Sequence, residues 1–356
     1  SKSNLGQGDT RIARIIMQAG NPLGRPDSIS SPLSRPNTTP RGSITPLLTI
    51  ALVASPNLRD PSTELLDRVL GAVRAEGPAS DLVAATLVAF DAPGIELPAP
   101  RRDAYEALQR EVERRSADAN VSMLTSVYRN IRVCRQLSFA HLCGLLKVTL
   151  RDCVHTPYVM VIQHDVILLR GRPQVDWPGL LQTMDAYPAL IHYVGFMERS
   201  NLGSSRMGHC LNHTGVLKQG VGFCWFSHFR NFSSSNVTVP LTQALGFIDR
   251  IHVARTAWYL NFVIPMCGTF GETRYQGFPE RAFTVSAKAE LGREMNTLGI
   301  SAPWPTAYDK YGTFLYGSAL STNGFYHYHL QGRCMGTTNA SDGESSYRCD
   351  KYSHHR

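Results

Sequence analysis

Three consecutive polar residues interrupt an apolar segment near the middle of this sequence. The segment Tyr158 to Leu169 reads YVMVIQHDVILL, which places Gln163, His164 and Asp165 directly after a run of apolar residues. Because unpaired polar groups are costly inside a buried strand, we expect these three where the strand leaves the core. A carboxylate such as Asp165, supported by Gln163 or His164, can hold Mg²⁺ or Mn²⁺ against a diphosphate. The plainer alternative is an aspartate that caps the next turn, with a hydrogen-bonded histidine beside it.

The elements that must position these residues alternate between strands and helices. Short apolar runs predict buried strands at Leu47–Ser55, Asp81–Pro93 and Tyr158–Leu169. Helices are predicted after Asp60-Pro61, from about Asp103, and from about Ser138 to Cys153. This order predicts an α/β fold with a Rossmann-type, mostly parallel sheet flanked by helices. Ligands of such a sheet bind at the carboxyl ends of its strands.

The second half of the sequence is more mixed. Its predicted elements are a short helix opened by Trp177-Pro178, a strand over Ala189–Phe196, long loops over 201–235, a helix over about Ile248–Asn261 and a strand over Phe325–Leu330. No change of composition requires a second domain here. We therefore predict one large domain with an elaborated, mixed second half.

Composition and charge exclude several classes of protein. With 43% hydrophobic and 18% charged residues, the chain of 356 residues is globular and not disordered. No run of 18 or more apolar residues is long enough to cross a membrane. The net charge of +8 favours anionic partners such as nucleotides and phosphates, but there is no tight Lys/Arg run, so nucleic acid is not an expected partner. The phosphate loop, nucleophile elbow and dinucleotide motifs are absent, which removes the main support for a kinase, an NTPase, an esterase or a dehydrogenase.

Cysteines, glycosylation sequons and the amino-terminal segment all favour the secretory pathway. Eight cysteines lie after residue 130, and six N-x-Ser/Thr sequons occur in the chain. Disulfides Cys210–Cys224 and Cys334–Cys349 would close plausible short loops. Residues 20–45 are rich in Pro, Ser, Gly and Arg, which predicts a linker or stem; an ordered arm wrapped on the domain is the alternative.

This arrangement of elements and motifs resembles the GT-A-fold glycosyltransferases. The points of resemblance are a buried strand ending in an acidic triplet, a helix before it, and a first strand about 110 residues earlier. The family triplet is usually Asp-x-Asp, whereas this chain has Gln163-His164-Asp165, so the first carboxylate is replaced. The resemblance covers roughly Leu47–Arg333 and is nearest to divergent algal or protist members.

The resemblance assigns roles to residues in both halves of the chain. Nucleotide-sugar binding falls to Ser55, Arg59, Asp91, Lys147, Gln163, His164 and Arg333. The expected ligands of a bound Mn²⁺ or Mg²⁺ are Asp165 and His329. His327, two residues earlier on the same strand face, is the alternative to His329. Two same-face histidines and a distant aspartate could instead form a zinc hydrolase site, although no third histidine at helical spacing supports this.

Acid–base chemistry and acceptor binding fall to the second half. Glu272 is the expected general base, with Asp249 as second choice, because an inverting transferase needs a carboxylate to take the proton of the acceptor hydroxyl. On the predicted helix Ile248–Asn261, His252 and Arg255 lie near one face and would line the acceptor pocket. The alternatives are that Glu272 caps a helix and that His252 is a hydrogen-bonded core residue.

We therefore predict an inverting, metal-dependent glycosyltransferase that moves a sugar from a nucleotide-sugar donor to a hydroxyl of a glycan, glycoprotein or other acceptor. The expected organisation is a stem (1–45), a catalytic domain (46–333) with a nucleotide-sugar half (46–170) and an acceptor half (171–333), and a tail (334–356). A Golgi or ER luminal location is expected, with membrane attachment only through an anchor absent from this chain. The alternatives are a non-catalytic carbohydrate- or nucleotide-binding protein of the same fold, and a cytosolic or nuclear transferase.

Overall fold

The structure is a computed structural model that describes eleven ranges of the chain. These are residues 47–55, 63–94, 97–121, 126–169, 175–196, 226–234, 237–247, 250–267, 277–301, 303–317 and 326–330. All of them belong to one unit, Ile44–Arg356. The predicted stem and tail lie outside the described residues.

The first half of the unit alternates strands and helices, as the sequence predicted. In chain order its elements are β1 (Leu48–Ala54), α1 (Thr63–Glu76), β2 (Val83–Phe90), α2 (Ala99–Val121), β3 (Ile131–Arg135), α3 (His141–Val148), the π-helix η3 (Thr149–Cys153), β4 (Tyr158–Gln163) and β5 (Val166–Leu168). The residues that α1 buries, Leu65, Leu66, Val69, Leu70 and Val73, recur at helical spacing. The short strand β3 was not predicted from the sequence. The predicted strand Tyr158–Leu169 is two strands, because the chain turns at His164 and Asp165.

The second half adds strands of both directions to the same sheet. Its elements are α4 (Trp177–Ala186), β6 (Tyr193–Gly195), β7 (Phe226–Ser234), β8 (Val237–Ala244), β9 (His252–Arg255), α7 (Thr256–Trp258), the π-helix η4 (Tyr259–Val263), α8 (Ile264–Met266), α9 (Pro279–Leu298), the 3₁₀ helix η5 (Pro305–Tyr311), β10 (Thr313–Tyr316) and β11 (His327–His329). Within 201–235, where long loops were predicted, residues 226–234 form strand β7. The hairpin of β7 and β8 and the long helix α9 were also not predicted.

The described strands form a nine-stranded sheet in the order β3-β2-β1-β4-β9-β6-β10-β8-β7 and a small ladder of β5 with β11. The strands β1, β2, β3 and β4 are parallel to one another. Antiparallel pairs begin at β9, which lies between β4 and β6. The α/β fold class is therefore confirmed, with a Rossmann-like parallel first half and a mixed second half.

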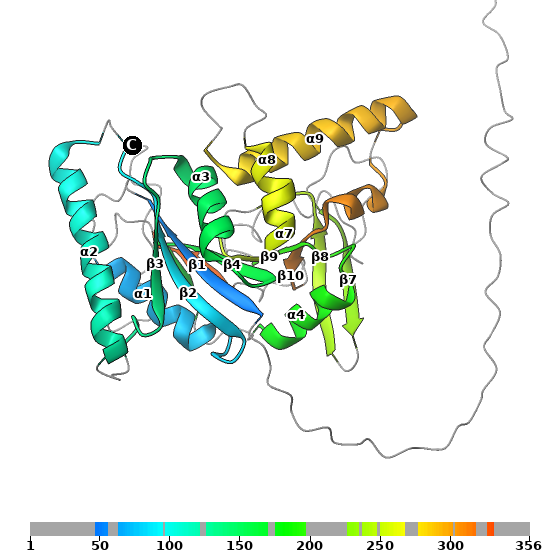
Figure 1. The fold of residues 1–356 in the computed structure, drawn as a ribbon. Coiled ribbons are helices and arrows are strands. Elements are labelled where there is room, and N and C mark those ends of the chain that lie inside the picture. Colours follow the sequence, from blue (N-terminus) through cyan, green and yellow to red (C-terminus); the bar gives the residue numbers. More distant parts are fainter. Residues whose placement is uncertain are drawn as a thin grey trace, which may run out of the picture. The chain divides into compact units, whose positions relative to one another are not determined.

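Helices cover both faces of this sheet. Figure 1 shows α3, α8 and α9 on one side and α1 and α4 on the other. One hydrophobic cluster joins alternate residues of β1 to α1, α2 and α4, and a second joins the intervening residues of β1 to α3, η4 and α9. All seven residues of β1 are buried, because a central strand covered on both faces has no polar side.

The predicted helix Ile248–Asn261 is wrong over its first half. His252 to Arg255 form strand β9, and helical structure begins only at Thr256. His252 and Arg255 therefore lie three residues apart on a strand and point to opposite faces, not to one helical face. The β9 backbone pairs with β4 and β6, and these non-local bonds override the local helical pattern.

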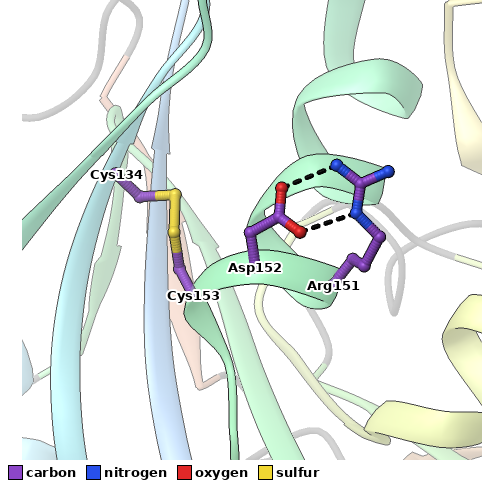
Figure 2. The surroundings of a disulfide bond; sticks show 4 residues. All are labelled: Cys134, Arg151, Asp152 and Cys153. Carbon is purple, nitrogen blue, oxygen red and sulfur yellow. Dashed lines mark hydrogen bonds and ion pairs between the residues drawn. A yellow bond between two sulfur atoms is a disulfide. The ribbon is translucent and has the colours of Figure 1, made fainter.

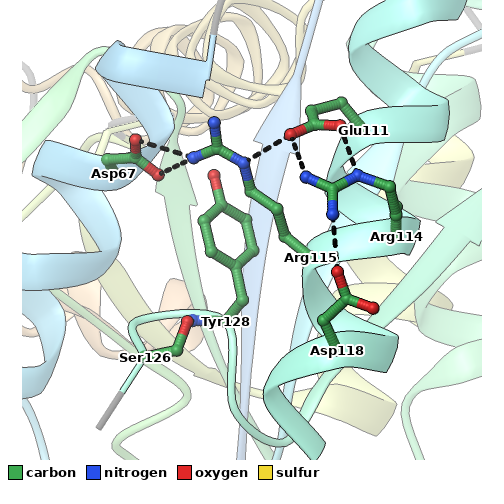
Figure 3. Close-up of polar contacts among 7 residues, drawn as sticks. All are labelled: Asp67, Glu111, Arg114, Arg115, Asp118, Ser126 and Tyr128. Carbon is green, nitrogen blue, oxygen red and sulfur yellow. Dashed lines mark hydrogen bonds and ion pairs between the residues drawn. The ribbon is translucent and has the colours of Figure 1, made fainter. Parts of the chain in front are cut away.

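A polar network joins α2 to α1 on one side of the sheet (Figure 3). Arg115 donates from Nε to Glu111 Oε1 at 2.8 Å and from Nη1 to Asp67 Oδ2 at 3.1 Å. Its guanidinium also lies 5.5 Å from the centroid of the Tyr128 ring. Hydrogen bonds from Arg114 and then Arg115 lower the pKa of Glu111 to about 2. Arg115 thus ties α2 both to α1 and to the turn that precedes β3.

Two disulfides hold the segment α3–η3 from both ends. Cys134 at the end of β3 bonds to Cys153 at the end of η3, beside the exposed ion pair of Arg151 and Asp152 (Figure 2). Cys143 in α3 bonds to Cys267, which follows α8. The cysteines of the predicted pairs Cys210–Cys224 and Cys334–Cys349 lie outside the described residues. Disulfides are typical of proteins that fold in an oxidising compartment.

Among the helices that the structure describes, none has both the length and the apolar character needed to cross a membrane.

Candidate functional site

The carboxyl ends of β1, β2 and β4 bring four predicted site residues, Ser55, Asp91, Gln163 and His164, to the same edge of the sheet. Val53 pairs with Gln163, and Ala54 pairs with Phe90, so the residues that follow these strands leave the sheet side by side. His164 donates its backbone N–H to Val53 O at 3.0 Å, and its ring Nδ1 lies 3.3 Å from the same oxygen. Ser55 and Asp91 leave the same edge, which we call the carboxyl edge. This is where parallel α/β sheets bind ligands.

The ladder of β5 and β11 brings a late segment of the chain back to Asp165. Val166 pairs with His329, and the backbone N–H of Leu330 donates to Asp165 O. A second bond, from Leu169 N to Tyr326 O at 2.9 Å, closes the other end of the ladder. Asp165 and His329 are far apart in sequence, yet the backbone places them in one short ladder next to the carboxyl edge.

The two histidines of β11 differ in what the structure shows of them. His327 is fully buried, and its Nε2 lies 2.7 Å from the backbone oxygen of Phe196. This contact assigns the His327 ring to the core and leaves His329 as the candidate metal ligand. For His329 only the backbone is described.

Asp91 is a buried carboxylate at the end of β2. It is 2% exposed, and its Oδ1 accepts a hydrogen bond from the backbone N–H of Ala140 at 3.2 Å. Burial raises the pKa of Asp91 to about 6, although bonds from the backbone at the start of α3 oppose the shift. At neutral pH the group is mainly ionised and can accept a further N–H from a ligand.

A charge cluster that sequence reasoning missed lies beside Asp165. The guanidinium of Arg250 is half-buried, and burial lowers its pKa, while the negative charges of Glu280 and Asp165 act in the opposite direction. Glu280 lies in the first turn of α9. A guanidinium that interacts with Asp165, near a predicted diphosphate site, can stabilise phosphate oxygens. Single-sequence patterns carry no signal for this cluster, because its members come from three separate segments.

The first turns of α2 also reach the carboxyl edge. Tyr105 donates its hydroxyl to Ala54 O at 3.1 Å. Arg101 and Arg102 lie four and three residues before it, so they share the face of α2 that meets this edge. Arg102 donates from Nη2 to Leu97 O at 3.2 Å. A buried tyrosine in an otherwise charged helix was the available signal, and the sequence analysis did not use it.

Two predicted residues lie in other surroundings. Lys147 is exposed in the last turn of α3, about 9 Å along the helix axis from its first turn, which is the one that contacts Asp91. Arg255 lies at the amino end of β4, where its Nε donates to Ile191 O at 3.1 Å and its guanidinium lies 5.3 Å from the Tyr158 ring centroid. The structure thus places Arg255 at the edge of the sheet opposite the carboxyl edge, and its acceptor-binding role stays a prediction.

His252 is a core residue at the start of β9. It is fully buried, its Nδ1 lies 2.8 Å from Arg250 O, and its ring is 4.9 Å from that of Tyr193. This corresponds to the alternative stated for His252, a hydrogen-bonded histidine of the core. Four further predicted residues lie outside the described residues, namely Arg59, Asp249, Glu272 and Arg333.

The sequence predicted a divalent cation at the carboxyl edge, shared with a diphosphate. Within the described ranges, no group of three His, Cys, Asp or Glu side chains could hold a metal by itself. Mg²⁺ and Mn²⁺ in phosphate sites usually take only one or two carboxylates and complete their shell with phosphate oxygens and water. A site of this type at Asp165 stays a prediction, because only the backbone of His329 is described.

Comparison with known proteins gives remote likenesses only. No known family and no curated protein matches the sequence. S. aureus TarS is 10% identical with a TM-score of 0.38, and the match covers 80% of this chain and 36% of TarS. GalNAc-T7 with UDP, GalNAc and Mn²⁺ is 11% identical, with a TM-score of 0.36 over 80% of this chain and 44% of that one. A UDP-glucose pyrophosphorylase complexed with UDP-glucose is 8% identical, with a TM-score of 0.36 over 68% and 88%.

The chain thus spans less than half the length of TarS and of GalNAc-T7. Likenesses this remote do not establish a shared function. None of them supports the algal or protist character expected from the sequence.

Proposed function

We propose that this chain is a glycosyltransferase that moves a sugar from a nucleotide-sugar donor to a hydroxyl acceptor. The observation that carries the proposal is the ladder of β5 and β11, which brings the backbone of His329 beside Asp165 at the carboxyl edge. The same edge receives the ends of β1 and β2 with Ser55 and Asp91. One edge therefore offers groups for a base, for a diphosphate and for a cation.

The donor is proposed to lie across the carboxyl edge. The ionised carboxylate of Asp91 accepts an N–H of the nucleobase, with Ser55 near the ribose. Arg250 stabilises the diphosphate by its charge. Asp165 and His329 would hold a Mn²⁺ or Mg²⁺, which would supply further positive charge near the leaving group. Gln163 and His164 fix the turn that presents Asp165.

The transfer step needs a carboxylate on the side of the acceptor. As the acceptor oxygen bonds to the anomeric carbon, the bond from that carbon to the diphosphate breaks, and the proton of the hydroxyl passes to the carboxylate. Glu272 stays the proposed base, with Asp249 second. Glu280 is an additional candidate, because the structure places it near Arg250. Attack opposite the leaving group inverts the anomeric configuration.

The proposed location is the Golgi or ER lumen, with a glycan, glycoprotein or other hydroxyl compound as acceptor. Two disulfides within the described residues agree with an oxidising compartment and weigh against the cytosolic or nuclear alternative.

Donor hydrolysis and transfer with a panel of nucleotide sugars test the proposal. We expect turnover with at least one donor in Mn²⁺ or Mg²⁺, and a loss of about 100-fold or more in Asp165→Asn. Asp118→Asn is the matched control, because that carboxylate is exposed on α2 and pairs with Arg114. Absence of turnover and of nucleotide binding across the panel, or full activity in a folded Asp165→Asn protein, would refute the proposal.

A non-catalytic nucleotide- or carbohydrate-binding protein is the second candidate. The observation that favours it is Gln163, which stands where the related triplets carry their first carboxylate. Such a protein would bind a nucleotide sugar with no turnover, and Asp165→Asn would change its affinity only. Calorimetry beside the turnover assay separates the two functions.

A further inference from the structure

A second candidate site lies at the amino ends of β1, β2 and β3, on the edge opposite the carboxyl edge. It is a cavity of about 880 Å³. Apolar side chains of Ile50, Leu70 and Val73 line one part of it, next to Trp177. The polar part is lined by Arg74, Glu76, Ser80, Asn120, Arg129, Asn130 and Arg132. We call this cavity the arginine pocket.

The turn between α2 and β3 forms one wall of the arginine pocket, and hydrogen bonds fix its shape. Arg74 on α1 donates from Nε to Val127 O at 3.1 Å and from Nη2 to Arg129 O at 2.5 Å. Asn130 adopts a left-handed backbone with φ of 60° and donates its N–H to Asn120 Oδ1 at 2.9 Å. These three bonds fix the backbone of the turn, so the position from which the exposed Arg129 side chain extends is set before a ligand binds.

The charges of the arginine pocket are unbalanced. Three guanidinium groups and a single carboxylate, Glu76, line it. Arginines elsewhere in the described ranges commonly have acidic partners, as the pairs Arg68–Glu64, Arg115–Asp67 and Arg135–Glu113 show. No such ion pair is formed by Arg129 or Arg132 with any described carboxylate. Burial and the charge of Arg129 both lower the pKa of Arg74, so the positive groups disfavour one another in the absence of an anion.

The size and lining of the pocket define the class of ligand. A volume of 880 Å³ lies in the range of small-molecule sites, about 300–1,000 Å³, and is far larger than one phosphate ion needs. Guanidinium groups match the planar geometry of carboxylate, sulfate and phosphate oxygens. The apolar floor beside Trp177 suits the less polar face of a sugar ring. The amino-terminal residues 1–46 are a poor occupant, because they carry six Lys/Arg and two Asp.

We infer that the arginine pocket binds a sugar-sized organic anion, in which Arg129 and Arg132 pair with a phosphate, sulfate or carboxylate group. The ligand contacts neither Asp91 nor Asp165, so this site is separate from the carboxyl edge. The inference does not depend on the proposed transferase activity, because it rests only on the cavity, its arginines and the fixed turn.

Titration calorimetry of the full chain tests the inference. The probes are glucose 6-phosphate, a sulfated heparin disaccharide, a glucuronate-containing disaccharide and neutral maltose. We expect at least one anionic probe to bind at least 10-fold more tightly than maltose. Its affinity should fall as the NaCl concentration rises from 50 to 200 mM, because salt screens the charges. The variant Arg129→Ala/Arg132→Ala should lose at least 10-fold in affinity, and Arg129→Lys/Arg132→Lys should restore part of it.

The control variant is Arg110→Ala/Arg114→Ala, which removes two exposed arginines of α2. Its affinity for the anionic probe should stay within 2-fold of the wild-type value. The inference is overturned if no anionic probe binds, if maltose binds equally well, or if the Arg129/Arg132 alanine variant binds like wild type. The last result would place the anion at another site, such as the carboxyl edge. Donor turnover should be unchanged in this variant, so a failure here is distinguishable from a failure of the proposed function.

Discussion

Asp91 is a buried carboxylate whose ionisation couples the stability of the fold to pH. Its pKa is about 6 in the folded protein, against 3.8 for an ordinary aspartate. Between these two values the unfolded chain loses the proton first, so the free energy of unfolding falls as pH rises from about 4 to about 6. Above about pH 7 the group is ionised in both states, and the decrease is complete.

We therefore predict that Asp91→Asn removes this part of the pH dependence. The amide keeps an oxygen for the N–H of Ala140 and carries no charge to desolvate. Relative to wild type, the free energy of unfolding of the variant should rise by on the order of 2 kcal/mol between pH 4 and pH 7. Urea denaturation at a series of pH values measures the difference. Parallel profiles of the two proteins would show that Asp91 does not titrate as described.

At the scale of single residues, the sequence predicted where polar residues end a buried strand. It did not predict which other residues these groups interact with. Gln163 is the last residue of β4, and His164 and Asp165 form the turn at the carboxyl edge, because unpaired polar residues are costly inside a strand that is buried on both sides. The sequence did not predict Arg250 or Glu280. Their proximity to Asp165 depends on long-range folding and not on spacing within a motif.

Arg115 links two helices, so its loss should cost more than the loss of an isolated surface pair. Its side chain is 35% exposed and contacts Asp67, Glu111 and the Tyr128 ring. We predict that Arg115→Ala lowers the free energy of unfolding by about 1 kcal/mol or somewhat more. The control Arg110→Ala breaks one exposed pair, 3.8 Å from Glu106, and should cost less than about 0.5 kcal/mol.

Urea denaturation in low and high salt measures both changes. In 1 M NaCl the two variants should differ less in the free energy of unfolding that they lose. The reason is that salt screens the ion pairs of the network, so that mainly the contact with the Tyr128 ring persists. Equal losses for Arg115→Ala and Arg110→Ala at low salt would show that the network does not connect α1 to α2 energetically.

At the scale of elements, the apolar pattern predicted the first half of the fold and was ambiguous in the second. The strand β1 and helix α1 follow from a continuous apolar run and from leucines at helical spacing. The segment of β9 has the same mixture of apolar and polar residues as a helix. Its pairing with β4 and β6 decides the outcome, and a local pattern does not contain that information.

At the scale of the whole molecule, the sheet separates two charged edges. The carboxyl edge combines Asp91 and Asp165 with Arg250, whereas the opposite edge carries the arginine pocket. A ligand at one edge has no contact with a ligand at the other. We therefore predict that saturating glucose 6-phosphate changes the affinity for a donor nucleotide by less than 2-fold. Calorimetric titration of the donor nucleotide, with and without glucose 6-phosphate, measures this change. A larger change would indicate coupling through the sheet or a shared site.

The disulfide Cys143–Cys267 connects the two halves of the described unit, whereas Cys134–Cys153 closes a local loop. Their sequence separations are 124 and 19 residues. Because a cross-link restricts the unfolded chain more when its loop is longer, Cys143→Ser/Cys267→Ser should cost about 5 kcal/mol and Cys134→Ser/Cys153→Ser about 3 kcal/mol. Guanidinium denaturation of the oxidised proteins measures both losses. As the control, the three proteins are compared after full reduction. Wild type and both variants should then have similar free energies of unfolding. A smaller loss for the Cys143/Cys267 variant than for the other would mean that local packing, and not loop length, sets the contribution of each bond.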